Sequence, residues 1–87
     1  MIMKVSFHKN FKKSYKRHPK KIRDQFDKRL KMFLDDPYNI LLNNHALHDE
    51  WLGFRSINVT GDFRAIFKHL NENLVEFVEI DTHNNIY

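Results

Sequence analysis

Apolar residues recur at two different spacings along the chain, which predicts helices first and strands afterwards. The opening stretch MKVSFH alternates polar and apolar residues, as expected of a short strand. Apolar residues then recur every four positions at Phe7, Phe11 and Tyr15, on one face of a predicted amphipathic helix. His18-Pro19 ends this helix. Pro19 suits the first turn of a second helix.

A second amphipathic helix is predicted after Pro19. Its apolar face contains Ile22, Phe26, Leu30, Phe33 and Leu34. The helix ends at Asp35-Asp36-Pro37, since the residue before a proline is pushed out of the helical region. Residues 37–50 then form an irregular connector, which is long enough to suggest a functional loop.

After the connector the spacing of apolar residues changes to two. GFRSINV (53–59) places Ser56 and Asn58 on one face and Ile57 and Val59 on the other. Turns at 60–62 and 71–73 separate it from FRAIFKH (63–69) and LVEFVEI (74–80). With 87 residues, the chain is predicted to be a single domain, 1–87, of the α+β class. An N-terminal strand and a helical hairpin would pack on an antiparallel β-meander.

Charge is divided unevenly between the two halves of the chain. Residues 1–34 contain twelve Lys or Arg and two acids, a local charge of +10. Residues 35–87 contain three Lys or Arg and nine acids, a local charge of −6. A basic half suggests a polyanionic partner, most simply nucleic acid, although a solvated helical surface has the same composition.

Composition also bounds the compartment and the cofactors. The chain has no cysteine, so it has neither disulfides nor thiolate metal sites, which fits a reducing compartment. No apolar run approaches the roughly 20 residues of a membrane helix, and the first residues lack the apolar core of a secretion signal. We therefore expect a cytoplasmic protein with no membrane partner and no cofactor.

Side chains able to transfer protons or bind anions lie near the ends of the predicted strands. They are His45, His48, Asp62, Arg64, His83 and Tyr87. Because neighbouring strands of a meander alternate in direction, the turn with Asp62 and the exit at His83 lie at the same end of the sheet. The loop with His45 can cross between the two ends.

Taken singly, these residues have simpler interpretations. Asp62 is a typical turn residue, and Arg64 could pair with Glu76 or Glu79 across the sheet. His45 and His48 have no third ligand at a suitable spacing, so a metal site is not predicted.

As a set, however, the residues match what metal-free RNA cleavage requires. A base must accept the ribose 2′-hydroxyl proton, an acid must protonate the leaving 5′-oxygen, and a cation must stabilise the charge at phosphorus. Histidine suits both proton transfers, since its unperturbed pKa is about 6.5.

A family resemblance is based on HALHDEWLGFRSINVTGDFRAIFK, followed by a strand and THNNIY. These stretches resemble the RelE superfamily of bacterial toxins, and most closely its YafQ branch, with the patterns H-x-L-x-x-x-W-x-G-x-R-x-x-x-V-x-x-D and T-H-x-x-[LI]-[FY]. The matching residues are His45, Leu47, Trp51, Gly53, Arg55, Val59, Asp62 and 82–87. The resemblance covers nearly the whole chain.

The resemblance implies the toxin of a type II toxin–antitoxin system. Such a toxin is an mRNA endoribonuclease (mRNA interferase) that cleaves A-site mRNA through metal-free attack by the 2′-hydroxyl and thereby inhibits translation. By position, His45 would be the base and His83 the general acid. Asp62 would orient a histidine, Arg64 would meet the scissile phosphate and Tyr87 would position the mRNA. His48 is a possible substitute for a histidine that the YafQ branch often has at Asn58.

The resemblance also implies partners. These are a cognate antitoxin in a hetero-oligomer that binds operator DNA, and the ribosome (16S rRNA) with its mRNA. We expect the contacts to RNA or the ribosome to come from Lys9, Lys12, Lys13, Lys16, Lys20, Lys21 and Arg55. Two alternatives stay open: a ParE-like inhibitor of DNA gyrase with the same fold, and a non-catalytic RNA- or ribosome-binding module.

Overall fold

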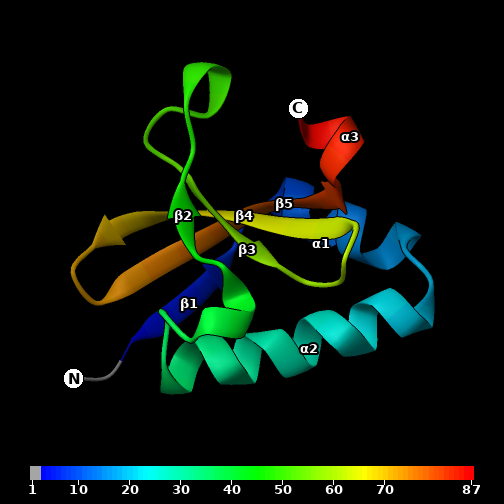
Figure 1. The fold of residues 1–87 in the computed structure, drawn as a ribbon, viewed down its shortest axis with the longest axis horizontal. Coiled ribbons are helices and arrows are strands. Elements are labelled where there is room, and N and C mark those ends of the chain that lie inside the picture. Colours follow the sequence, from blue (N-terminus) through cyan, green and yellow to red (C-terminus); the bar gives the residue numbers. More distant parts are fainter. Residues whose placement is uncertain (1–2) are drawn as a thin grey trace.

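A computed structural model describes residues 3–87, in which two helices cover one face of a five-stranded sheet (Figure 1). The strand order is β1-β5-β4-β3-β2, with β1 parallel to β5 and the other pairs antiparallel. The strands are β1 (Lys4–Phe7), β2 (His45–Ala46), β3 (Arg55–Asn58), β4 (Phe63–Asn71) and β5 (Leu74–Thr82). The helices are α1 (Lys9–Arg17), α2 (Lys20–Asp35) and α3 (His83–Ile86), with 3-10 turns η1 (Ile40–Leu42) and η2 (Asp49–Trp51). The predicted α+β fold is confirmed.

The two long helices begin and end close to where the sequence predicts. The Nδ1 atom of His8 caps α1 by accepting a hydrogen bond from the backbone N–H of Asn10 (3.0 Å). Pro19 directly precedes α2, and Asp36 follows it with its N–H bonded to the Met32 carbonyl (2.8 Å). Local capping and proline chemistry therefore account for where the two helices begin and end.

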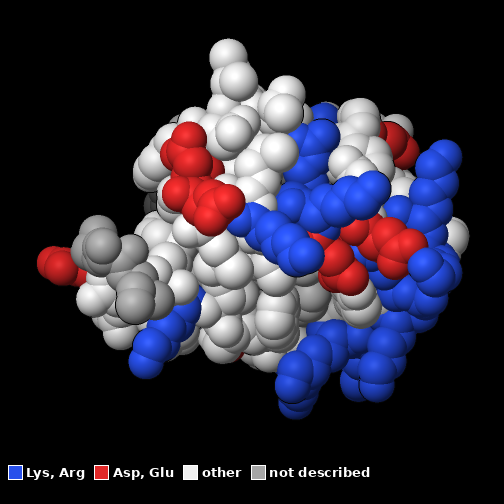
Figure 2. Space-filling view, turned by 90° about the horizontal axis from the view of Figure 1, so that it is seen from below, with Lys and Arg blue, Asp and Glu red and all other residues white. Residues whose placement is uncertain are grey.

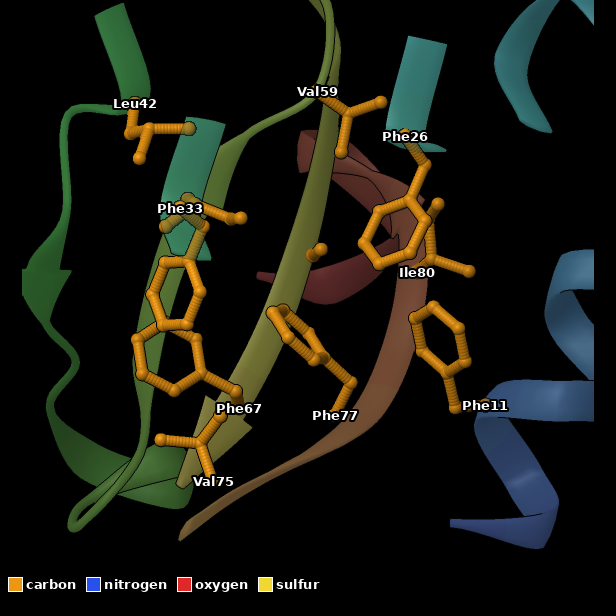
Figure 3. Close-up of a cluster of buried hydrophobic side chains, with 11 residues drawn as sticks. Phe11, Phe26, Phe33, Leu42, Val59, Phe67, Val75, Phe77 and Ile80 are labelled. Atoms are coloured by element: carbon orange, nitrogen blue, oxygen red, sulfur yellow. The ribbon is translucent and has the colours of Figure 1, made fainter. Parts of the chain in front are cut away.

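Aromatic rings fill the space between the helices and the sheet. The Phe77 ring lies at the centre, with its centroid 5.3 to 5.8 Å from those of Phe67, Phe26, Phe33 and Phe11 (Figure 3). All five side chains are buried. Tilted and edge-to-face ring pairs add to the stabilisation that burial provides. The helices are thus fixed to the sheet by one continuous aromatic cluster.

A β-bulge shifts the register of β5 midway along the strand. Ile66 pairs with Glu79 but Phe67 pairs with Phe77, which leaves Val78 as an extra residue in β5. Sequence alternation alone predicted a regular strand here. A bulge depends on tertiary packing, and no glycine marks its position.

The bulge decides which side chains beyond it face the helices. A regular β5 would pair Ile80 with Arg64 on the face away from the core. In the structure Ile80 instead pairs with Ala65 and is fully buried in the core. Asp81 becomes the partner of Arg64. The one-residue shift therefore exchanges the two faces of the last part of β5.

Beyond Phe77 the outer edge of β5 is covered by side chains and α1 instead of by a strand. β1 ends at Phe7 and pairs only with residues 74–77. The Ile80 carbonyl accepts a hydrogen bond from His18 Nε2 (2.8 Å), and the Ile80 N–H donates to Glu79 Oε1 (2.9 Å). Because unpaired backbone groups at a sheet edge are unfavourable when buried, these bonds stabilise the end of the strand.

Three local features differ from the sequence prediction. The connector contains the two-residue strand β2, the expected strand at 53–59 begins only at Arg55, and the chain ends in the short helix α3. Gly53 has φ +93°, a left-handed conformation that suits the loop before β3. Both β2 and α3 are too short to produce a periodic pattern, so apolar spacing does not predict them.

We expect His18→Ala to lower the free energy of unfolding by about 1–3 kcal/mol, because it leaves the Ile80 carbonyl without its donor. Urea unfolding followed by circular dichroism measures the change. His48→Ala is the matched control, since His48 is exposed and makes no capping hydrogen bond. Equal losses in both variants would show that the bond at the β5 edge does not stabilise the fold.

Candidate active site

The polar residues singled out in the sequence gather mainly on the face of the sheet that points away from α1 and α2. We call this face the site face. Loop 47–54 and α3 rise above it in Figure 1, on the side opposite α2. Across the strands, His45 pairs with Ser56, Ser56 with Ile66, and Asn58 with Arg64. Because paired residues share a face, His45 and Arg64 lie on the same side of the sheet in adjacent rows.

A cavity of about 520 Å³ opens between loop 43–49, the start of β4 and α3. Its lining residues are Asn43, His45, Ala46, Leu47, His48, Asp49, Arg64, His83 and Tyr87. The structure therefore brings together five residues of the predicted set: His45, His48, Arg64, His83 and Tyr87. Two others, Asp62 and Arg55, do not line the cavity.

A backbone contact fixes the proton on His45. Its Nδ1 lies 2.7 Å from the Asn43 carbonyl oxygen. A carbonyl can only accept a hydrogen bond, so Nδ1 must carry the proton. In the neutral ring, Nε2 then has the free lone pair, which is the form that a general base needs.

Helix α3 is held against the rest of the molecule, although it lies at the end of the chain. The Thr82 hydroxyl oxygen caps it by accepting from the Asn85 N–H (3.3 Å). The indole Nε1–H of Trp51, on the loop across the site face, donates to the Ile86 carbonyl (3.2 Å). These bonds fix the direction of the last residues.

This helix brings the rings of His83 and Tyr87 together. Their centroids lie 4.6 Å apart at an interplanar angle of 54°, and the Tyr87 N–H bonds to the His83 carbonyl (3.1 Å). Tyr87 remains 54% exposed. A half-exposed phenol ring at the mouth of a cavity is available for stacking on a nucleobase.

Asp62 contributes through its backbone. Its carbonyl accepts a hydrogen bond from the His83 N–H (2.8 Å), which joins the β3–β4 turn to the start of α3. The carboxylate is on an exposed residue outside the cavity lining. The predicted role of the Asp62 side chain in orienting a histidine therefore remains a prediction.

Arg64 is attached to the same turn by one nitrogen. Its Nη1 lies 3.0 to 3.2 Å from the carbonyl oxygens of Thr60, Gly61 and Phe63. Within residues 3–87, its Nε and Nη2 have no acceptor, and the single ion pair joins Lys20 and Asp24 instead. The pairing with Glu76 or Glu79 that we considered is thus not formed. Neutral carbonyls do not cancel the charge of Arg64, which stays available at the cavity wall.

Arg55 lies on the opposite face and holds the loop before His45. Its Nε donates to Asn44 Oδ1 (2.8 Å), and its guanidinium carbon lies 5.7 Å from the Tyr38 ring centroid. These contacts hold residues 38–44 from the face of the sheet opposite the site face. The structure therefore gives Arg55 a positioning contact, and direct binding of RNA by this residue stays a prediction.

Two polar residues that line the cavity, Asn43 and Asp49, were not predicted from the sequence. Both have positive φ, +46° and +55°, which few residues other than glycine adopt. Asn43 also provides the carbonyl that orients His45. Asn and Asp are enriched at left-handed backbone positions, and this enrichment could have indicated the two residues. A loop contains many Asn and Asp residues, however, so the enrichment alone does not single them out.

An apolar groove, separate from the cavity, lies between α1 and α2. It has a volume of about 440 Å³ and is lined by Phe7, Phe11, Lys12, Tyr15, Lys16, Phe26, Asp27 and Leu30. The Tyr15 hydroxyl donates to Asp27 Oδ1 across the groove (2.8 Å). Burial and this bond raise the pKa of the Tyr15 phenol.

Basic side chains surround the groove and continue along both helices. Figure 2 views the molecule from the α2 side and shows Lys and Arg gathered toward the end where α1 and α2 join. The predicted RNA-binding lysines are all exposed, namely Lys9, Lys12, Lys13, Lys16, Lys20 and Lys21. The helical layer is therefore cationic, as the sequence indicated.

Two further properties concern residues 3–87 only. No helix in this part of the chain is long and apolar enough to cross a membrane. The same residues contain no group of three His, Asp or Glu side chains that could hold a metal ion.

Comparison with solved structures identifies the fold. YafQ from E. coli strain BL21(DE3) superposes with a TM-score of 0.76 at 21% identity, covering 98% of both chains. YafQ in the E. coli DinJ-YafQ toxin-antitoxin complex gives 0.78 at 19% identity, over 100% of this chain and 99% of that one. A YoeB/ParE toxin from Agrobacterium tumefaciens gives 0.75 at 15% identity, over 93% and 99%. At these identities the likeness shows the fold alone, which is that of the RelE-like toxins.

The sequence itself places the chain in a family. Residues 5–87 match the family described as "ParE toxin of type II toxin-antitoxin system, parDE". The chain therefore belongs to the ParE toxin family of type II toxin–antitoxin systems, with the RelE-like fold predicted from its motifs. No curated protein sequence matches it.

We expect Trp51→Phe to loosen α3, because it removes the donor to the Ile86 carbonyl while keeping an aromatic ring. The Tyr87 amide should exchange with solvent about fivefold faster, as the loss of one neutral hydrogen bond implies. Amide hydrogen exchange by NMR measures this. Phe54→Leu is the control, since Phe54 packs edge-on against Trp51 but gives α3 no bond. Similar effects of the two substitutions would show that packing, and not the indole bond, holds α3.

Proposed function

We propose that this toxin is a metal-independent endoribonuclease that cleaves mRNA on the ribosome and so inhibits translation. The observation that carries the proposal is the gathering of His45, Arg64, His83 and Tyr87 around one cavity. The likeness to YafQ in fold and motif is consistent with it.

The chemistry requires one base and one acid on either side of a phosphate. His45 Nε2 would remove the proton from a ribose 2′-hydroxyl, and the 2′-oxygen would attack the adjacent phosphorus. The bond from phosphorus to the 5′-oxygen then breaks, and protonated His83 gives its proton to that oxygen. The products are a 2′,3′-cyclic phosphate end and a 5′-hydroxyl end.

The remaining residues have supporting roles in this proposal. Arg64 would stabilise the negative charge that develops on the phosphate oxygens. Tyr87 would stack on a base next to the scissile bond. His48 lines the same cavity and is exposed, so it is a second possible proton carrier. The Asp62 carboxylate would act on His83 from the adjoining turn.

The cationic helical layer supports binding to the ribosome in the cytoplasm. Exposed lysines on α1 and α2 can contact phosphates of 16S rRNA without reading sequence. They lie on a different layer from the cavity. The mRNA could therefore occupy the site while the helices contact rRNA.

A second candidate function is inhibition of DNA gyrase. It is favoured by the family match, since that family is named for the ParE toxins. A gyrase inhibitor has no chemical need for two histidines and an arginine around one cavity. For this reason we place RNA cleavage first.

We expect His45→Ala and His83→Ala each to reduce mRNA cleavage about 10²- to 10⁴-fold, because each removes one proton transfer. Primer extension on cellular transcripts after induction maps the cuts, which should fall in frame. His69→Ala is the control, since His69 is exposed and does not line the cavity. Growth arrest that persists in both active-site variants, with intact mRNA and inhibited gyrase, would favour the gyrase function instead.

We also propose that a cognate antitoxin neutralises this toxin in a hetero-oligomer that binds operator DNA. Two of the similar structures are complexes by their descriptions, DinJ-YafQ and RelBE2 from Mycobacterium tuberculosis. The groove between α1 and α2 suits such a partner. Its apolar floor and its lysines Lys12 and Lys16 would accept an amphipathic helix with acidic residues along its flank.

We expect the double substitution Lys12→Glu/Lys16→Glu to weaken antitoxin binding at least tenfold, because it places like charges at the groove. Calorimetry with the antitoxin encoded beside the toxin measures the affinity. Lys13→Glu/Lys21→Glu is the control with the same change in charge, at exposed lysines that do not line the groove. Equal weakening by both pairs would indicate general electrostatic attraction and not a groove-bound helix. Both pairs should weaken ribosome binding alike.

A further inference from the structure

Two side-chain oxygens on β3 are buried and have no hydrogen-bond partner within residues 3–87. They are Ser56 Oγ and Asn58 Oδ1, both on the site face. Buried polar atoms are nearly always paired in folded proteins, and leaving one unpaired is unfavourable. Unpaired atoms that collect beside a candidate site therefore indicate groups held for a contact that forms only when a ligand binds.

Of the two, Asn58 is the one next to a side chain with unused donors. It lies directly opposite Arg64 in the β3–β4 pair. Arg64 bonds only through Nη1, to carbonyls of the turn at 60–63, so three of its five N–H groups are unused. A residue with an unused acceptor thus lies opposite a residue with unused donors in the β3–β4 pair.

We propose that Asn58 is the positioning residue for Arg64 during anion binding. When a phosphate enters the cavity, the guanidinium leaves the turn carbonyls and its Nε–H donates to Asn58 Oδ1. Nη1 and Nη2 then face the phosphate as a fork, the geometry in which arginine binds phosphate most tightly. The inference rests on the proposed function, because it assumes that Arg64 meets a phosphate in this cavity.

The chemistry of asparagine fits this role. Its amide oxygen is a neutral acceptor, so it can orient the guanidinium without cancelling the positive charge. A carboxylate at the same position would pair with the guanidinium and compete with the phosphate. Asp81 is the partner of Arg64 in the β4–β5 pair. Its carboxylate Oδ1 accepts hydrogen bonds from the Thr82 N–H (2.7 Å) and from Asn85 Nδ2 (3.1 Å). Asp81 forms no ion pair with Arg64, since the single ion pair within residues 3–87 joins Lys20 and Asp24.

The test follows the Arg64 Nε–Hε resonance of ¹⁵N-labelled toxin during titration with inorganic phosphate. The resonance is assigned by its loss in Arg64→Lys. In the wild type, phosphate should move it downfield and slow its exchange with solvent. Asn58→Leu should abolish both changes and weaken phosphate binding about tenfold.

The same substitution should raise Tm by about 4 °C or more, because it removes a buried unpaired oxygen.

Two further variants complete the design. Ser56→Ala removes the other unpaired oxygen, opposite His45 and Ile66. It should also raise Tm but leave the Arg64 resonance and the phosphate affinity unchanged. Asn58→Asp keeps the acceptor and adds charge, so the resonance should be shifted before any phosphate is added. Phosphate should then bind more weakly.

The inference is overturned by any of three results. These are a lower Tm in Asn58→Leu, a phosphate affinity of Asn58→Leu equal to that of the wild type, or an unshifted resonance in Asn58→Asp. None of these measurements involves cleavage. The two proposals can therefore fail separately. If phosphate binding depends on Asn58 but the toxin leaves mRNA intact, the proposed function is disproved and the role of Asn58 is retained.

Discussion

The one-residue bulge at Val78 is the constraint on which the rest of the structure depends. It returns Ile80 to the aromatic core after Phe77, where a regular strand would have turned it away. The same shift makes Asp81 the partner of Arg64 and directs the chain into α3 beside the β3–β4 turn. Core packing and the position of His83 are thus decided together, because both follow from the register of one strand.

Backbone carbonyls accept most of the hydrogen bonds that position the residues of the candidate site. The Asn43 carbonyl orients His45, the Asp62 carbonyl holds His83, and the turn carbonyls hold Arg64. Using main-chain acceptors leaves the His45 lone pair and most donors of Arg64 free for a substrate. A histidine oriented in advance in this way suits proton transfer.

The two layers of the fold present different chemistry on opposite sides of the sheet. The helical layer has exposed lysines and an apolar groove, while the sheet layer has the cavity with its histidines. The uneven charge of the sequence becomes a separation in space, since residues 1–34 supply the helices. We infer that binding of a polyanion or an antitoxin and the chemistry at the cavity can be altered by separate sets of substitutions.

The sequence by itself determined the elements and their order. Apolar spacing gave the amphipathic helices α1 and α2 and the strands β3 to β5, because each has a local period and a local stop signal such as Pro19. Residue spacing also indicated the family, and with it His45, Arg64, His83 and Tyr87 as candidates for one site. No local period marks β2, α3 or the bulge at Val78, so these were not predictable.

Only the tertiary structure decided which of the candidate residues meet. It gathered five of them around the cavity, left the Asp62 side chain outside it and placed Arg55 on the opposite face. It also showed Asn58 Oδ1 unpaired beside Arg64. The physical reason is that register, bulges and backbone hydrogen bonds between distant segments set these distances. Local spacing along the chain does not encode them.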